Sequence, residues 1–157
     1  MTSIRRMEEK DIEKAARLEA ENFSSPWSKH AFAETLRCGY AFYYVAEADA
    51  DIIGICGLRN IAGEGEITNV SVDHRHRREG VAAALLAKAL EDGGKMGIEA
   101  FTLEVRSGNR PAICLYEKFG FKNAGIRKNF YDNPKEDAVI MWKRQEEDGR
   151  ITTVFTP

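Results

Sequence analysis

The amino-acid sequence predicts an α/β (α+β) fold, in which a mixed and mostly antiparallel sheet of about seven strands packs with about four helices. The chain has 157 residues, of which 43% are hydrophobic and 31% are charged, as in a single globular domain. Short segments rich in aromatic and β-branched residues recur between turn residues, which is typical of hairpins. Two of the expected helices lie between strands, and this arrangement requires some parallel pairing.

The N-terminal part is expected to hold one strand and two helices. Ile4–Met7 fits a short strand. Asp11 precedes apolar residues at helical spacing and is expected to cap a helix that ends around Phe23. The segment Ser24-Ser25-Pro26-Trp27 interrupts that pattern. Ser28 is then expected to cap a second helix that ends near Gly39.

Three strands joined by turns are expected next. Tyr40–Glu47 and Ile52–Ile61 are separated by the turn residues Asp49-Ala50-Asp51. A turn at Gly63–Gly65 leads into the third strand, Glu66–Val72.

The C-terminal half is expected to alternate helices and strands. Gly80–Leu90 is rich in Ala and Leu and is expected to stop at Gly93-Gly94. Asn109 is expected to cap a helix that has Pro111 in its first turn and ends at Gly120. Strands are expected at Ala100–Arg106, Lys122–Tyr131 and Asp137–Trp142. Residues 1–143 thus form one expected domain, and the tail at 144–157 has no functional interpretation.

Composition and charge argue against several classes of protein. The 23 basic and 25 acidic residues give a net charge of −2, whereas a chain that holds nucleic acid through its overall field is strongly basic. No apolar stretch approaches about 18 residues and no secretory segment follows Met1, so we expect a cytoplasmic protein without membrane contact. Cys38, Cys56 and Cys114 form no C-x-x-C pair, which argues against a disulfide framework and a zinc site. A cysteine nucleophile remains an open alternative.

The densest positive run, His74-Arg75-His76-Arg77-Arg78, lies between an expected strand and Gly80. Such a run is usually a solvated surface. Here, however, the free N–H groups and the dipole at the start of the Gly80 helix favour a phosphate or pyrophosphate. Gly80 allows close approach because a Cβ would occupy the space of a phosphate oxygen, and Ala82 is small for the same reason. The sequence lacks the Walker and dinucleotide-binding glycine patterns; it has Arg77-Arg78-Glu79-Gly80-Val81-Ala82, of the form [Q/R]-x-x-G-x-[G/A].

Glu104 and Tyr116 are candidates for proton transfer. Glu104 is either a solvent-facing carboxylate on an amphipathic strand or a general base. The second role requires burial or an intervening water, because a free glutamate has a pKa of about 4.3. Tyr116 is either a core aromatic or a hydroxyl donor. A phenol with a pKa of about 10 is able to protonate a departing thiolate with a pKa of about 8.5.

Several separate blocks resemble the GNAT superfamily of acyl-CoA-dependent N-acetyltransferases, over about residues 3 to 143. The blocks are Pro26-Trp27-Ser28 with Phe32, Val70 through Ala83, Leu103-Glu104-Val105-Arg106, Asn109, Leu115 through Phe121, and Ile126 through Tyr131 with Glu136-Asp137-Ala138. The Pro-Trp-Ser block and the block Arg127-Lys128-Asn129-Phe130-Tyr131 are similar to the bacterial ribosomal-protein-alanine N-acetyltransferases within that superfamily.

The resemblance implies a set of roles. Acetyl-CoA would be the co-substrate, bound by Val70, Ser71, Val72, Arg77, Arg78, Glu79, Gly80, Val81, Ala82, Ala83 and Asn109. Glu104 would accept a proton and Tyr116 would donate one, in a direct attack within a ternary complex that needs no metal. Arg127, Asn129 and Tyr131 are candidates for holding the acceptor, and surface residues on an edge strand are the alternative.

The expected acceptor is a protein N-terminus, with the N-terminal alanine of a small-subunit ribosomal protein favoured. An α-amine with a pKa of about 8 is roughly one-tenth neutral at pH 7, against about one part in 2,500 for lysine. A modest base therefore suits an α-amine better. Two alternatives stay open, namely a GNAT enzyme that acetylates a small-molecule amine and a non-catalytic acyl-CoA-binding module. Nucleic-acid binding through the basic run is disfavoured by the net charge.

Overall fold

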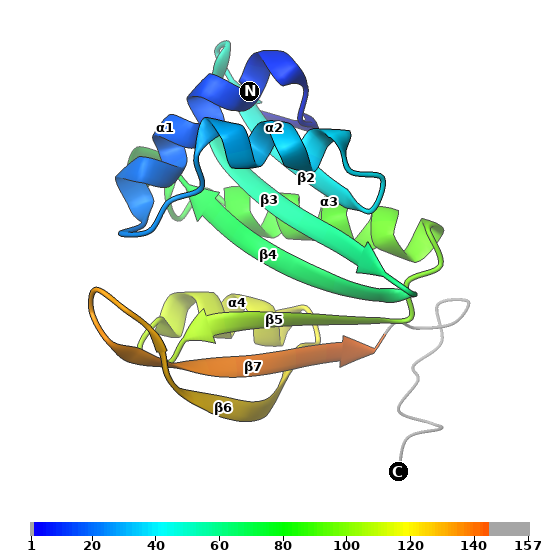
Figure 1. Ribbon diagram of the computed structural model, residues 1–157, viewed down its shortest axis with the longest axis vertical. Helices are drawn as coiled ribbons and strands as arrows, with labels where there is room; N and C mark the ends of the chain where they lie inside the picture. The colour runs from blue at the N-terminus through cyan, green and yellow to red at the C-terminus, as the bar shows by residue number, and fades with distance from the viewer. Residues whose placement is uncertain (1, 145–157) are drawn as a thin grey trace.

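The computed structural model describes residues 2–144 and confirms the expected fold class. Within that range a seven-stranded sheet has the order β1-β2-β3-β4-β5-β7-β6, and its one parallel pair is β4 with β5 (Figure 1). The strands are β1 (Thr2–Arg6), β2 (Ala41–Ala48), β3 (Asp51–Ile61), β4 (Glu64–Val72), β5 (Ala100–Arg106), β6 (Lys122–Tyr131) and β7 (Glu136–Arg144). The α-helices are α1 (Ile12–Asn22), α2 (Lys29–Arg37), α3 (Val81–Lys95) and α4 (Arg110–Lys118).

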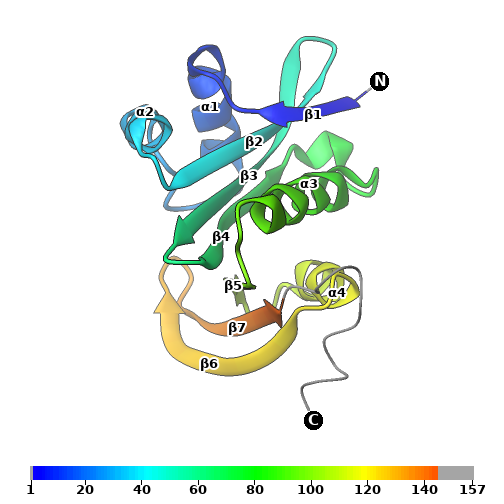
Figure 2. The same ribbon diagram turned by 90° about the vertical axis from the view of Figure 1, so that its right-hand side faces the viewer.

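Each face of the sheet carries its own hydrophobic core. Helices α1 and α2 cover one face and α3 and α4 the other (Figure 2). The first core includes Leu18, Phe32 and Tyr43, which come from α1, α2 and β2. The second and larger core joins α3 and α4 to the opposite face and includes Leu85 and Phe101. The sheet is therefore covered on both sides.

Helix α1 begins where the sequence predicted, but Asp11 does not cap it. Its side chain accepts no hydrogen bond from the first turn of α1. Instead, the carboxylate accepts the backbone N–H of Glu8 at 2.8 Å and two hydrogen bonds from the Arg5 guanidinium at 2.8 and 2.9 Å. Asp11 thus closes the short 3₁₀ turn at Glu9–Asp11 and ties it to β1. Ser28, in contrast, caps α2 as expected, since its Oγ accepts the Ala31 N–H.

Helix α3 does not stop at Gly93-Gly94, as the sequence suggested, but continues to Lys95. The reason is packing. A Cβ on Gly93 would lie 2.7 Å from the Phe101 ring, so the glycine allows α3 to approach β5 closely. The helix ends before Gly97, whose φ of 88° is left-handed. At the C-terminal end, β7 runs one residue past the expected domain boundary, through Arg144. The rest of the predicted tail, 145–157, lies outside the described residues.

Candidate active site

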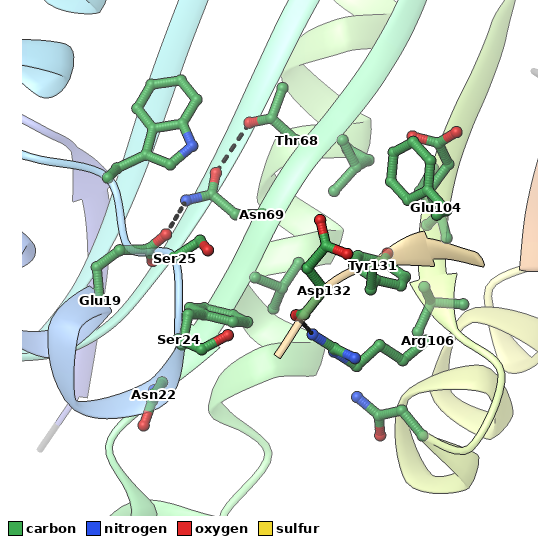
Figure 3. Close-up of a pocket in the computed structure, with 18 of the residues that line it drawn as sticks. Glu19, Asn22, Ser24, Ser25, Thr68, Asn69, Glu104, Arg106, Tyr131 and Asp132 are labelled. Atoms are coloured by element: carbon green, nitrogen blue, oxygen red, sulfur yellow. Dashed lines mark hydrogen bonds between the residues drawn. The ribbon is translucent and has the colours of Figure 1, made fainter. Parts of the chain in front are cut away.

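A cleft of about 620 Å³ lies between β4 and β5 (Figure 3). One wall comes from α1 and the segment after it, and the opposite wall comes from β5, α4 and the β6–β7 turn. The lining residues are Glu19, 22–25, Trp27, 67–70, 103–106, Asn109, Tyr116 and 130–134. The cleft therefore brings together residues that are more than 80 positions apart in the sequence.

The cleft exists because β4 and β5 separate. The two strands pair only between Glu64–Ile67 and Ala100–Leu103. On its other side, β4 stays paired with β3, with an irregularity in register between Cys56 and Leu58. At that irregularity, a Cβ on Gly57 would collide with Thr68 Oγ1 and Asn69 Oδ1. From Thr68 onward, the β4 edge that faces β5 has no strand partner within the described chain, and its backbone groups face the cleft instead.

Glu104 and Arg127 form an ion pair at the cleft wall. Glu104 lies on β5 with its side chain 24% exposed, and Arg127 Nε on β6 lies 2.8 Å from its Oε2. The Arg127 side chain is 58% exposed and also packs over the Phe130 ring at 5.6 Å. Glu104 is therefore half-buried, carries a cationic partner and faces the cleft (Figure 3). Glu104 is thus not a freely solvated carboxylate, and its role as a general base stays a prediction.

Tyr116 is both a core aromatic and a cleft residue. Its ring makes an edge contact with Phe121 at a centroid distance of 5.9 Å, and the residue is 7% exposed. Burial, with smaller contributions from Cys56 and Tyr131, raises the pKa of Tyr116 well above its usual value. The hydroxyl therefore stays protonated at neutral pH and is able to donate a hydrogen bond into the cleft.

The basic loop, residues 74–79, leads into the start of α3 as the sequence predicted. Arg78 and Gly80 both have left-handed backbone conformations, with φ of 67° and 80°, and Gly80 is the N-cap. The first intrahelical donor is the Ala84 N–H, bonded to Gly80 O at 3.0 Å. The N–H groups of residues 81–83 precede it and have no intrahelical partner. A Cβ on Gly80 would meet nothing within 4 Å, so the protein itself requires this glycine for its φ and not for packing.

Asp73 holds this loop in place. Its carboxylate accepts the Arg75 backbone N–H at 2.9 Å and two hydrogen bonds from the Arg75 guanidinium at 3.1 and 2.7 Å. Its own N–H donates to Ile53 O on β3. The Arg75 side-chain hydrogen bonds, followed by the backbone one, hold the pKa of Asp73 far below its usual value. Asp73 thus ties the loop to β3 through its backbone N–H and holds Arg75 through its charged carboxylate.

Asn22 links the loop to the cleft. The residues Arg77–Ala83 lie outside the cleft lining, whereas Asn22 belongs to it. The Asn22 amide oxygen accepts Arg77 Nη2 at 3.4 Å, and its Nδ2 donates to Val72 O at 3.0 Å. The same Nδ2 donates to the hydroxyl of buried Ser71. The loop and the cleft are therefore neighbouring parts of one surface.

The remaining predicted residues divide between the cleft and its supports. Val70 and Asn109 line the cleft, and Asn109 also caps α4 by accepting the Ala112 N–H at 3.2 Å. Tyr131 lines it too, with the Arg106 guanidinium 4.5 Å above its ring. Asn129 lies outside the lining on β6 with φ of 53°, and its N–H donates to Asp137 Oδ1 at 2.9 Å. The geometry thus gives Asn129 a turn contact and not a cleft contact.

Sequence reasoning missed a polar group on the α1 side. Glu19 is buried, and its Oε1 accepts Asn69 Nδ2 at 3.2 Å. Asn69 Oδ1 in turn accepts the Thr68 hydroxyl at 2.9 Å (Figure 3). The sequence signal was present, because Glu19 follows Ile12 and Ala15 at helical spacing and so falls on the buried face of α1.

The three cysteines form no disulfide in the described residues. Cys38 is half-buried, Cys56 is buried and Cys114 is exposed, and all three are free. Burial raises the pKa of the Cys56 thiol to about 12, so this thiol is not a nucleophile at neutral pH. Among residues 2–144, no cluster of three His, Cys, Asp or Glu side chains has the arrangement of a metal site. None of the helices described in that range is long and apolar enough to span a bilayer.

Comparison with known proteins agrees with this architecture. Residues 12–121 match the family model of the acetyltransferase (GNAT) family. A Bacillus subtilis relative, provisionally named ribosomal protein bS18-alanine N-acetyltransferase, is 38% identical over 141 residues, which cover 89% of this chain and 93% of the relative. The Escherichia coli K12 protein of that name, without the provisional mark, is 32% identical over 143 residues, or 90% of this chain and 96% of its own.

Solved structures give the same result. The crystal structure of the ribosomal-protein-S18-alanine N-acetyltransferase from Escherichia coli superimposes with a TM-score of 0.85 at 28% identity, and covers 96% of this chain and 99% of that one. Ard1 from Thermoplasma volcanium reaches a TM-score of 0.85 at 26% identity, over 93% and 99% of the two chains. The family model covers most of the chain, and two relatives exceed 30% identity over nearly all of it. The chain therefore belongs to the GNAT family of acetyltransferases and is an acyltransferase.

Proposed function

We propose that this acyltransferase moves the acetyl group of acetyl-CoA onto the α-amine of a protein N-terminus, with the N-terminal alanine of ribosomal protein bS18 as the favoured acceptor. The observation that carries the proposal is the cleft between β4 and β5, which holds Glu104 and Tyr116 and borders, through Asn22 and Arg77, the loop before α3. The names of the relatives at 38% and 32% identity support the choice of acceptor.

The residues before α3 fit the pyrophosphate of acetyl-CoA. Free N–H groups at residues 81–83, the left-handed Gly80 and the exposed Arg77 and Arg78 supply donors and positive charge at one place. Open space beside Gly80 Cα leaves room for a phosphate oxygen. The unpaired β4 edge at Thr68–Val72 would align the pantetheine arm, which then reaches the cleft past Val70.

Two proton transfers accompany the reaction. The amine nitrogen attacks the thioester carbonyl carbon, and the carbon–sulfur bond breaks as the amide bond forms. Glu104, through a water where needed, takes the proton that the amine loses, while Arg127 holds its carboxylate in place. Tyr116 donates its proton to the departing sulfur. Burial makes Tyr116 a weaker acid, and the same burial would raise the proton affinity of a thiolate formed beside it, which offsets part of that loss.

An N-terminal peptide suits the shape of the cleft. Its mouth is bordered by the segment after α1 on one side and by the β6–β7 turn on the other, and Phe23 and Phe130 expose apolar surface there. A cytoplasmic location follows from a ribosomal acceptor and belongs to the same proposal.

Mass spectrometry of acetylation tests the proposal. Purified protein is incubated with acetyl-CoA and, in separate reactions, a peptide that starts with the bS18 N-terminal alanine, the same peptide with a blocked α-amine and an internal lysine, and a panel of polyamines and amino sugars. We expect one acetyl group, on the alanine nitrogen of the first peptide. Faster acetylation of the small amines would instead assign the protein to the small-molecule branch, and binding of acetyl-CoA without any transfer would indicate a non-catalytic module.

A further inference from the structure

Glu19 is a buried carboxylate with an incomplete set of partners. The residue is 2% exposed, yet it belongs to the cleft wall. Its Oε1 accepts the Asn69 amide, whereas Oε2 has no hydrogen-bond partner within residues 2–144. Burial raises the pKa of Glu19, and the hydrogen bonds from Asn69 and the Trp27 backbone lower it by less. A buried carboxylate normally requires more compensation than this.

The two buried or half-buried carboxylates on the cleft walls differ in their charge balance. Glu104 is paired with Arg127 at 2.8 Å. No Lys, Arg or His in the part of the chain that the structure describes forms an ion pair with Glu19. Asp132 also lines the cleft, but it is exposed and its charge is screened by water. Among the carboxylates that line the cleft, Glu19 is therefore the buried one without a cationic partner within residues 2–144.

The chemistry of the acceptor supplies the missing cation. An α-amine with a pKa of about 8 enters the cleft mostly as an ammonium at neutral pH. An ammonium carries three donors, and its attraction to a carboxylate is stronger in a buried site than in water. Glu19 lies across the cleft from Glu104, so an amine held on the α1 side would stand opposite the proton acceptor (Figure 3).

We infer that Glu19, with Asn69 as its hydrogen-bond partner, is the subsite that draws and positions the ammonium group of the acceptor. The inference rests on the proposed function, because it assigns a place to that acceptor's α-amine. Glu19 acts here as a positioning residue that binds the amine in its charged form before Glu104 removes the proton. The exposed ammonium of a free N-terminus is thereby distinguished from a blocked or neutral chain end.

The inference is tested with two peptides that differ only in the charged group. One starts with alanine and the other carries a propanoyl group in place of alanine, so that hydrogen replaces the α-amine. Calorimetry measures both dissociation constants for wild type, Glu19→Gln and the control Glu13→Gln, all saturated with CoA. Glu13 lies on the same helix with its side chain 72% exposed. Wild type and the control should prefer the alanine peptide about ten- to hundredfold, the value of a charge-assisted hydrogen bond, and Glu19→Gln should bind both peptides equally.

Other outcomes overturn the inference in distinct ways. If Glu19→Gln keeps the preference while it still acetylates the alanine peptide, the subsite is wrong and the proposed function stands. If Glu19→Gln weakens the binding of both peptides by the same factor, Glu19 has only a packing role. The wild-type protein is measured first. If it neither binds nor acetylates the alanine peptide, both proposals are overturned.

A second variant covers the case in which Glu19→Gln does not fold. Glu19→Asp keeps the charge and withdraws it by one methylene, so it should weaken binding of the alanine peptide more than binding of the propanoyl peptide. Equal weakening of both would overturn the inference of an ammonium subsite. Thermal melting of both variants accompanies the titrations, and Glu19→Gln should melt no lower than wild type because it removes an incompletely paired buried charge.

Discussion

Arg127 illustrates how one contact changes the role of a residue. The sequence suggested that it holds the acceptor, but its guanidinium lies against Glu104 and Phe130 and outside the cleft lining. We propose that a group in this place acts on the acceptor through Glu104. Its contribution should therefore appear in the proton transfer and not in the binding of the peptide.

The variant Arg127→Gln separates these two roles. We expect kcat to fall about ten- to hundredfold, because Glu104 loses the group that orients it, while the KM for the alanine peptide stays near the wild-type value. Steady-state kinetics with saturating acetyl-CoA measures both. Lys128→Gln is the matched control, since Lys128 is 82% exposed on the same strand and pairs with Asp137. A raised KM with unchanged kcat would restore the role in acceptor binding.

The ring of Tyr116 packs in the core, and its hydroxyl is the group proposed to act in the cleft. Tyr116→Phe should lower kcat about 10²–10⁴-fold and leave the dissociation constant of acetyl-CoA nearly unchanged, because the ring contact with Phe121 is kept. Single-turnover kinetics and calorimetry give the two quantities. Tyr44→Phe serves as control, since the Tyr44 hydroxyl donates to Asp92 at 2.9 Å and lies outside the cleft lining. Normal turnover in Tyr116→Phe would exclude Tyr116 as the acid.

At the scale of elements, the proposed role of Gly80 in binding phosphate can be separated from its effect on backbone strain by comparison with Gly97. Gly80 and Gly97 stand at the two ends of α3 with φ of 80° and 88°, and a Cβ on either meets nothing within 4 Å. Alanine at each position should cost a similar 1–2 kcal/mol of stability, roughly the cost of a left-handed conformation. Only Gly80 faces the proposed phosphate site.

Gly80→Ala should therefore raise the dissociation constant of acetyl-CoA about tenfold, as for loss of one charge-assisted hydrogen bond, while Gly97→Ala leaves it unchanged. Chemical denaturation compares the stabilities and calorimetry the affinities. Equal affinities in the two variants would show that the start of α3 is not the phosphate site.

The sequence determines local elements better than it determines their contacts. Hydrophobic period, caps and turn residues place each strand and the starts of the four α-helices close to where they lie, since these signals act within a few residues. The prediction for the end of α3 was wrong because Gly93 packs closely against Phe101 on β5, and the sequence does not show this contact between separate elements. The pairing of Glu104 with Arg127 and the burial of Glu19 likewise depend on strand order, which local patterns do not encode.

At the scale of the molecule, Asp73 is a joint between the sheet and the loop before α3. It follows β4, its backbone N–H donates to Ile53 O on β3, and its carboxylate accepts from Arg75. Arg75 holds the pKa of Asp73 below its usual value. The ionised carboxylate therefore stabilises the folded state, and this contribution depends on pH. The stabilisation is complete above the unfolded pKa of about 3.9 and is lost as the pH falls toward the lower folded pKa.

The variant Asp73→Asn lacks this stabilisation at every pH. Its melting temperature should lie below that of wild type at pH 7, and the gap should narrow steadily from about pH 4 to pH 2, because wild type loses the same interaction on protonation. Scanning calorimetry across that range measures the gap. Asp51→Asn, which removes a 61% exposed carboxylate 3.8 Å from Lys14, should follow wild type throughout. A gap that stays constant down to pH 2 would mean that Asp73 stabilises the joint through its shape and neutral hydrogen bonds, and that its charge contributes nothing.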